Sequence, residues 1–155
     1  MNSDQITRRS AVEDTDRVRA HSSESVNRQF DNEAQQCVLQ FADKTREDIT
    51  AHISDLSREW DMERYLETNA SLLALGGVLL GATVNRKFLI VPGVVFGFLF
   101  QHAVQGWCPP MPVFRHMGVR TRKEINREKY ALKALRGDFD DLSSDAASRE
   151  QRIYP

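Results

Sequence analysis

Apolar residues are concentrated in the middle of the chain, where two uncharged stretches follow each other. Residues 68–85 carry no charge over 18 positions, and residues 88–114 carry no formal charge over 27 positions. Uncharged apolar stretches of about 18 residues or more are candidates for membrane-spanning helices. Arg86 and Lys87 interrupt the block and form a short polar turn with Asn85. The pattern therefore predicts a two-helix transmembrane hairpin over residues 67–107.

A buried hairpin of a soluble protein is the alternative interpretation of this block. The strongly apolar part of the first helix, Ala70 to Val84, has only 15 residues. At about 1.5 Å per residue it is shorter than the roughly 30 Å hydrocarbon layer, so flanking residues must extend it. The charged arms on either side offer little apolar surface to cover the block in water, and this favours the membrane.

Residues 25–66 show a different pattern, in which one apolar position recurs every three or four residues without interruption by Pro or Gly. This spacing predicts one long amphipathic helix, with Ser25 as its N-cap. Its single apolar face needs a partner: another copy in a coiled coil, the basic C-terminal helix, or the membrane surface. The stripe consists of Val26, Phe30, Ala34, Cys37, Phe41, Thr45, Ile49, Ile53, Leu56 and Trp60.

Glycines are spaced four residues apart in each apolar stretch. Close helix packing in membranes uses such small-residue pairs because they let two backbones approach. The pairs are Gly77 with Gly81 and Gly93 with Gly97. We expect them to pack helices together, either inside the hairpin or between copies, and the spacing alone leaves both open.

The C-terminal part begins with prolines and continues as a basic helix over residues 108–137. Thr121 and Glu124 have the spacing of a capping box, and Gly137 stands where a helix stop is expected. Residues 1–24 and the acidic tail 138–155 contain few apolar side chains, so we predict that both are disordered. The predicted fold class is thus all-α, a transmembrane hairpin flanked by two further helices.

Charge follows the same segmentation. Residues 1–69 hold 9 basic and 15 acidic side chains, whereas residues 105–136 hold 8 basic and 2 acidic ones. A basic segment directly beside an apolar block suits an anionic lipid surface and does not indicate nucleic-acid binding. Basic residues near the hairpin ends outnumber those in its turn, which places both termini in the cytoplasm. The six at the ends are Arg58, Arg64, Arg115, Arg120, Arg122 and Lys123.

Residues 49–139 resemble a known family. The run GWCPPMPVFRHMGVRTRKEINREKYALKALRGDF, behind a two-helix hairpin, is similar to the YgaP-like inner-membrane domain family of bacteria. The most specific feature is the pair Cys108-Pro109 after the second helix. The resemblance implies a bacterial inner-membrane protein that associates into homo-oligomers. Some members carry a cytoplasmic rhodanese domain before the hairpin; here a charged helix is predicted in that place, so we do not expect sulfurtransferase activity to carry over.

The stretch Gln101 to Pro112 is the candidate site for chemistry, and three interpretations compete. In the first, Gln101, His102 and Gln105 form the polar belt where the helix meets the lipid headgroups. In the second, Cys108 is a reactive thiol that carries a persulfide from a separate cytoplasmic sulfurtransferase. In the third, Cys108 and His102 bind haem or a metal, but six residues place them on different faces of a helix.

The first interpretation explains most of these residues, so we predict a non-enzymatic membrane anchor or self-associating assembly module. The thiol carrier is the alternative. We expect no cofactor and no metal, because neither a phosphate-binding loop nor a second ligand pair occurs at a useful spacing. Cys37 lies on the apolar stripe and is predicted to be a small buried hydrophobic residue.

Overall fold

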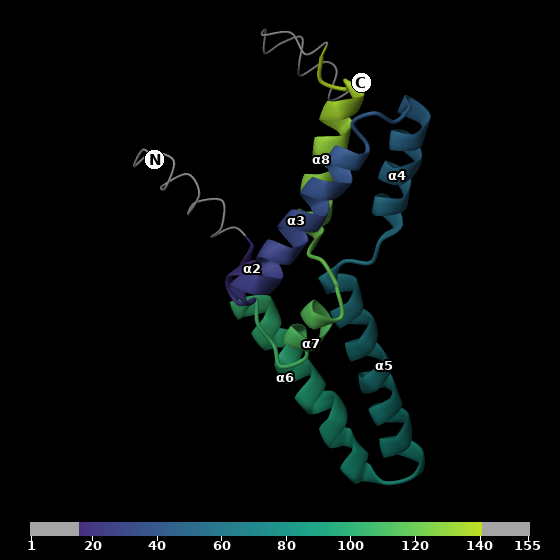
Figure 1. Ribbon diagram of the computed structural model, residues 1–155. Helices are drawn as coiled ribbons and strands as arrows, with labels where there is room; N and C mark the ends of the chain where they lie inside the picture. The colour runs from purple at the N-terminus through teal and green to yellow at the C-terminus, as the bar shows by residue number, and fades with distance from the viewer. Residues whose placement is uncertain (1–15, 141–155) are drawn as a thin grey trace, which may run out of the picture. The chain divides into compact units, whose positions relative to one another are not determined.

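The computed structural model describes residues 16–140, which fold entirely into helices and connecting turns (Figure 1). The prediction of an all-α chain is confirmed, since no strand occurs within this range. The elements are α2 (Arg17–Ala20), α3 (Glu24–Gln40), α4 (Arg46–Arg58), α5 (Met62–Thr83), the 3-10 helix η1 (Arg86–Leu89), α6 (Ile90–Gln105), α7 (Met111–His116) and α8 (Arg122–Arg136).

The chain divides into two compact units. Within the described range, the first unit comprises residues 16–31 and 60–125, and the second comprises residues 32–59 and 126–140. Helices α3 and α8 each contribute residues to both units. The apolar helices and the predicted reactive residues all belong to the first unit.

In the first unit, α5 packs against α6, and η1 joins the two (Figure 1). Two helical segments, one ending with α5 and the other formed by η1 and α6, are long and apolar enough to cross a membrane. At about 1.5 Å per residue, the 22 residues of α5 span about 33 Å. Asp61 caps α5 by accepting a hydrogen bond of 2.9 Å from the Arg64 N–H, so this helix begins at Met62.

The single N-terminal helix predicted over residues 25–66 is wrong, because the structure breaks this range into α3, α4 and the first residues of α5. Thr45 is the N-cap of α4 rather than a position inside a helix. Its hydroxyl accepts from the Asp48 N–H at 3.2 Å, and the Asp48 carboxylate accepts from the Thr45 N–H at 3.4 Å. This capping box satisfies N–H groups that would otherwise lack partners, which makes a helix start favourable here.

The predicted apolar stripe nevertheless identifies residues that are buried. Val26 and Phe30 of α3 are buried in the first unit, and Ile49, Ile53 and Leu56 of α4 are buried in the second. Burial inside one copy removes the continuous free stripe that a coiled coil between copies requires. These five positions are therefore not available to a coiled coil between copies, and self-association through the rest of the stripe stays a prediction.

Part of the segment predicted as disordered is folded. Asp16 caps the short helix α2, and Val18 is 5% exposed within the core of the first unit. A segment poor in apolar residues is ordered here because Val18 enters the core, and Arg17 and Arg19 find polar partners. The remainder of the two predicted disordered ends, residues 1–15 and 141–155, lies outside the described residues.

The capping predicted for the C-terminal helix is confirmed. The Thr121 hydroxyl accepts from the Glu124 N–H at 3.2 Å, the Glu124 carboxylate accepts from the Thr121 N–H at 2.8 Å, and α8 extends to Arg136. Gly137 follows with φ 86°, a left-handed conformation that favours glycine. Leu132 of α8 is fully buried in protein, so this position of its apolar face does not meet lipid.

Candidate functional site

The predicted site residues lie at the end of the α5–α6 pair that is opposite η1. Helix α6 ends at Gln105, and Gly106 turns the chain with φ 75°. Gln101 and Gln105 face each other on the last turns of α6, with 3.5 Å between their side-chain amide groups. Cys108 then leads into α7. The structure thus brings the end of α6 and the start of α5 to a common base.

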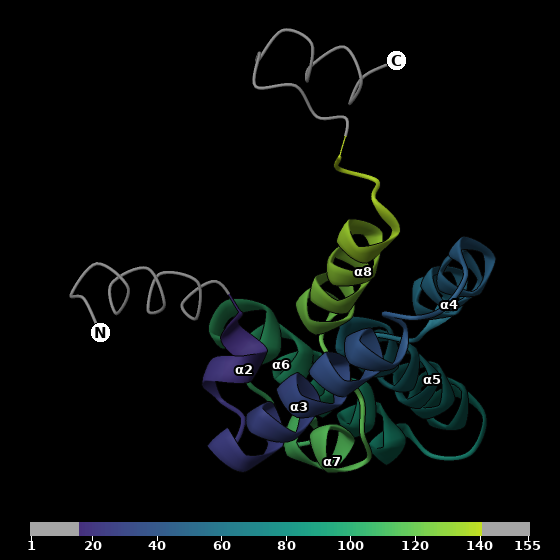
Figure 2. The ribbon, with the colours of Figure 1, turned by 45° about the horizontal axis from the view of Figure 1, so that its top comes forward.

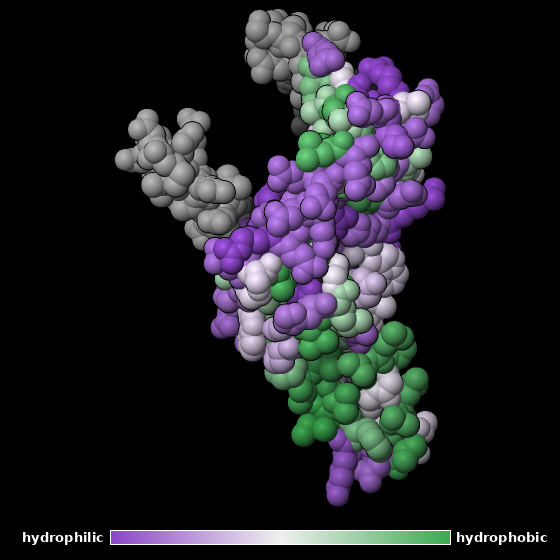
Figure 3. Space-filling model, viewed as in Figure 1, coloured by the Kyte–Doolittle hydropathy of each residue, from purple (hydrophilic) through white to green (hydrophobic). Residues whose placement is uncertain are grey.

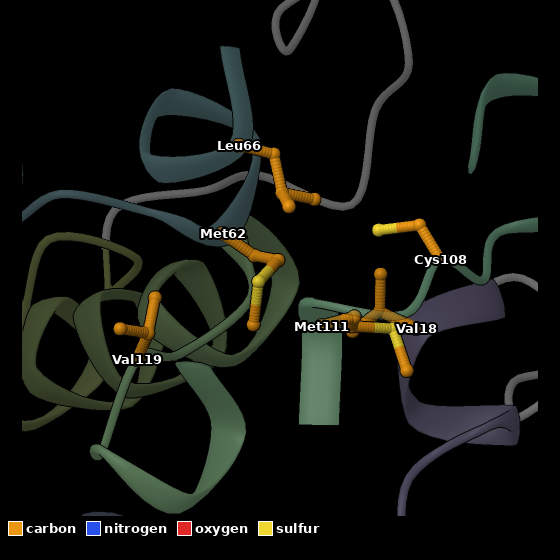
Figure 4. Packing of buried hydrophobic residues seen from close by; sticks show 6 residues of the cluster. All are labelled: Val18, Met62, Leu66, Cys108, Met111 and Val119. Carbon is orange, nitrogen blue, oxygen red and sulfur yellow. The ribbon is translucent and has the colours of Figure 1, made fainter. Parts of the chain in front are cut away.

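Six buried apolar side chains form the core of this base (Figure 4). They come from α2, α5, α7 and the adjoining turns, and their side chains point toward one another. The Cys108 sulfur points into the cluster on the side of Leu66. We call this set the base core: Val18, Met62, Leu66, Cys108, Met111 and Val119.

Cys108 has the properties of a packing residue. Cys108 is only 2% exposed, and burial raises the pKa of its thiol above the ordinary value. A thiol that attacks or carries sulfur needs an accessible thiolate, which forms when nearby positive charge lowers the pKa.

Cys108 and His102 line the same cavity, so the structure does bring these two predicted residues together. The cavity has a volume of about 210 Å³ and lies between α5, α6 and the start of α7. Its walls are almost entirely apolar, and they include Leu66, Phe98 and Phe114. The buried Nδ1 atom of His102 has no hydrogen-bond partner among residues 16–140. One histidine and one cysteine in an otherwise almost entirely apolar wall are too few ligands for a structural metal site, which needs four.

A buried ion cluster, which the sequence did not predict, holds the base together. Arg115 is 3% exposed and donates to both oxygens of the Glu124 carboxylate, at 2.7 and 2.9 Å. Arg115 also donates to the Asn27 side-chain oxygen at 3.0 Å, and its guanidinium lies 4.4 Å from the Phe30 ring centroid. Two-point contacts between arginine and carboxylate are among the stronger charge-assisted hydrogen bonds.

Arg19 of α2 extends this cluster. It bridges the carboxylates of Asp31 and Glu124, each at 2.8 Å. Burial by itself would raise the pKa of Glu124, but hydrogen bonds from Arg115 and from the Thr121 N–H, together with the charges of Arg115 and Arg19, lower it. Glu124 is therefore a carboxylate at neutral pH. We call Arg19, Asp31, Arg115 and Glu124 the base ion cluster.

Two further contacts close the base around the helix ends. The Met62 N–H, which has no partner inside α5 because it stands in the first turn, donates to the Arg120 carbonyl at 2.9 Å. The guanidinium of Arg17 donates to the carbonyls of Ala103 and Val104 at the end of α6, at 3.2 and 3.0 Å. Figure 2 shows α2 beside the end of α6. A cation at this position satisfies free carbonyls and complements the helix dipole.

The two glycine pairs differ in their surroundings. A Cβ added to Gly77 would lie 2.6 Å from Pro92, and one added to Gly81 would lie 2.6 Å from Leu89. These two glycines therefore let α5 approach η1 and α6 closely. A Cβ on Gly93 or on Gly97 would meet nothing within 4 Å. The spacing left open whether the glycines pack helices inside the hairpin or between copies. The pair Gly77 and Gly81 packs helices inside the hairpin.

Sequence reasoning missed the residues of the base ion cluster. Their partners are separated by up to 105 positions, as for Arg19 and Glu124, and no local spacing links them. The one available signal was the basic excess of residues 105–136, which contain only two acidic residues, Glu124 and Glu128. Both of these are buried, which the charge pattern did not indicate.

Comparison with known proteins gives no relative for this chain: no protein-family model, curated protein or solved structure matches it. The similarity to the YgaP-like family remains a prediction from the residues quoted above. The function must therefore be argued from the geometry of the chain itself.

Proposed function

We propose that this chain is a small integral membrane protein in which α5 and α6 insert as a transmembrane hairpin and the base stays at the membrane surface. The observation that carries the proposal is the exposure of large apolar side chains along both helices. Leu72 is 64% exposed, Ile90 71% and Phe100 72%. On the face seen in Figure 3, the hydrophobic surface gathers over α5 and α6.

The cost of this exposure in water supports a lipid environment. Each fully buried Leu, Ile, Val or Phe side chain gains about 1.5–3 kcal/mol over an exposed one, and twelve such side chains are exposed on these two helices. Monomeric soluble proteins rarely show apolar patches of this kind. In a bilayer the same side chains contact lipid tails, and the helices satisfy their own backbone hydrogen bonds.

The polar features support a defined orientation. The base carries the basic flanks of the hairpin, whereas η1 carries Arg86 and Lys87. The excess of basic residues beside the base favours its location in the cytoplasm. The resemblance to the YgaP-like family, which is bacterial, adds the inner membrane to this proposal.

A non-enzymatic role suits the chemistry of the base. Cys108 is packed and protonated, and the charged groups of the base ion cluster bind one another. What remains free is the small-residue face of α6 at Gly93 and Gly97, where another helix could approach closely. We therefore propose a membrane anchor whose hairpin associates with a second copy through this face.

The test uses arginine substitutions at matched exposure. Leu75 is 58% exposed on α5 and Phe96 58% exposed on α6. The double variant carries Leu75→Arg and Phe96→Arg. Each arginine makes membrane insertion less favourable by about 2.5–3.5 kcal/mol near the middle of a membrane span. We expect the wild-type chain to resist alkaline carbonate extraction from bacterial membranes and the double variant to be extracted or degraded.

The control changes two equally exposed residues outside the hairpin. Leu39 of α3 is 65% exposed and Tyr130 of α8 59% exposed. The variant Leu39→Arg with Tyr130→Arg should stay in the membrane fraction like the wild type. Extraction of the wild-type chain by carbonate would overturn the proposal, and so would equal behaviour of the two double variants.

A further inference from the structure

Three side chains with metal-binding atoms meet in the second unit. Cys37 comes from α3, His52 from α4 and Glu128 from α8. The Cys37 sulfur lies 3.1 Å from His52 Nε2, and the Glu128 Oε1 atom lies 3.5 Å from the same nitrogen. The three candidate ligand atoms all lie within 4.8 Å of one another. Each of the three helices that contribute to this unit thus supplies one candidate metal ligand to the same small cluster.

The surroundings of the cluster hold these donors in place. The Glu128 side chain is 3% exposed, and the His52 side chain is 29% exposed. The Phe41 ring stacks on the His52 ring at 4.5 Å between centroids with an interplanar angle of 20°. Stacking fixes the plane of the imidazole, and the remaining exposure of His52 leaves a path for solvent.

The direction of approach distinguishes a metal site from a catalytic triad. In a triad of nucleophile, histidine and carboxylate, the two partners contact opposite ring nitrogens, so that a proton passes through the imidazole. Here the sulfur and the carboxylate oxygen both approach Nε2. A neutral imidazole carries either one hydrogen or one lone pair on that atom, so it can form a full hydrogen bond with only one of the two groups. Convergence on a common centre is instead what ligand atoms around a cation show.

We propose that Cys37 Sγ, His52 Nε2 and Glu128 Oε1 bind a divalent zinc-type cation, with water as the fourth ligand. Zinc binds sulfur at about 2.3 Å, nitrogen at about 2.0–2.1 Å and carboxylate oxygen at about 2.0–2.2 Å. Tetrahedral placement at these lengths separates the ligand atoms by roughly 3.4–3.6 Å. The observed separations of 3.1 and 3.5 Å are close to this, so small side-chain movements admit the ion.

The donor set selects the class of metal. A thiolate and an imidazole suit zinc, cobalt and similar ions, whereas magnesium and calcium prefer oxygen ligands alone. The thiolate and the carboxylate together balance a charge of +2. The bound ion would link α3, α4 and α8, so its binding would also stabilise the second unit.

The experiment uses the full-length reduced protein in detergent micelles, with cobalt as a spectroscopic probe and zinc for affinity. We expect a single equivalent of cobalt to give a near-ultraviolet thiolate-to-cobalt band that zinc then displaces. Cys37→Ser should abolish the band. His52→Gln and Glu128→Gln should weaken zinc binding by more than the 10–100-fold typical for loss of an outer-shell partner.

Matched controls are available for two ligand types. Cys108→Ser removes the other cysteine of the chain, and His116→Gln removes an exposed histidine. Both variants should keep the cobalt band and the zinc affinity. The wild-type spectrum is decisive even if a variant misfolds: the absence of a thiolate-to-cobalt band in the wild type would overturn the proposal. A band that persists in Cys37→Ser would overturn it as well.

Discussion

The α5–α6 pair and the base beneath it follow opposite rules of burial. Along the helices, Leu72 and Phe100 expose 64% and 72% of their surface. In the base, Arg115 and Glu124 expose only 3% and 5%. Soluble proteins normally keep large apolar groups inside and bury charges only in pairs. The first unit thus exposes large apolar side chains on its two long helices and buries charged side chains in its base.

Under the proposed membrane insertion, each region is matched to a different solvent. Apolar surface on α5 and α6 is unfavourable in water but neutral against lipid tails, so these helices need little burial within the chain. The base must instead hold two helix ends together without an extensive apolar core. It does so with the base core and with charges that satisfy one another, a solution that depends on complete pairing.

The largest effect is expected from breaking that pairing. Arg115→Leu leaves the buried Glu124 carboxylate with Arg19 alone among its arginine partners, and loss of one partner of a buried ion pair costs about 3–5 kcal/mol. Arg122→Leu removes an arginine that is 62% exposed and paired with Asp61, and such pairs contribute about 0–1 kcal/mol. Denaturant unfolding in micelles, followed by circular dichroism, measures both. If the two variants lost the same free energy of unfolding, burial of the Arg115–Glu124 pair would not be what stabilises the base.

An intermediate effect is expected inside the helix pair. Gly77→Ala places a methyl group 2.6 Å from Pro92, and such overpacking costs about 1–3 kcal/mol. Gly97→Ala places its methyl group in open space, where alanine is the better helix former by about 1 kcal/mol. The midpoint temperature of thermal unfolding should therefore fall for Gly77→Ala and rise for Gly97→Ala.

The same glycines test self-association. Gly97→Leu should leave the folded chain intact and reduce crosslinking between copies, because its side chain projects from the free face of α6. Unchanged crosslinking in Gly97→Leu would contradict pairing through this face. Gly77 serves as the contrast, since its contacts lie inside one chain.

Features that depend on neighbouring residues could be predicted from the sequence. The two apolar helices follow from uncharged runs, and the start of α8 follows from the spacing of Thr121 and Glu124. The buried stripe was also identified, because helical periodicity marks a face even where the helix is interrupted. The interruption itself was missed, since Thr45 was counted as a stripe residue and its capping box with Asp48 was not considered.

Features that depend on distant residues could not be predicted. Val18 joins the base core from a segment that is otherwise polar, and composition alone made this segment look unstructured. Arg115 was counted among the basic flanks of the hairpin and Glu124 as a capping residue, because the charge pattern does not reveal that the two side chains are enclosed together. Cys37 and His52 are 15 positions apart on separate helices, and only the packing of the second unit brings Glu128 beside them.

The smallest effect is expected from acid, which removes the charge of Glu124 without removing its side chain. Arg115, Arg19 and the Thr121 N–H lower the folded-state pKa of this carboxyl against the opposing effect of burial, whereas in the unfolded chain it is about 4.3. A group with a lowered folded pKa contributes its full stability above the unfolded value and loses it as the pH falls through the folded value.

The stability gap between wild type and Glu124→Gln isolates this contribution, because the other carboxylates titrate in both proteins and the arginines stay charged. We expect the gap to be constant from neutral pH to about 5.5 and to shrink progressively below about 4.3, the pKa of an unperturbed glutamate. Urea midpoints measured at a series of pH values provide the curve. A gap that widens as the pH falls would mean that the folded-state pKa is raised, and that burial outweighs the arginines in the base ion cluster.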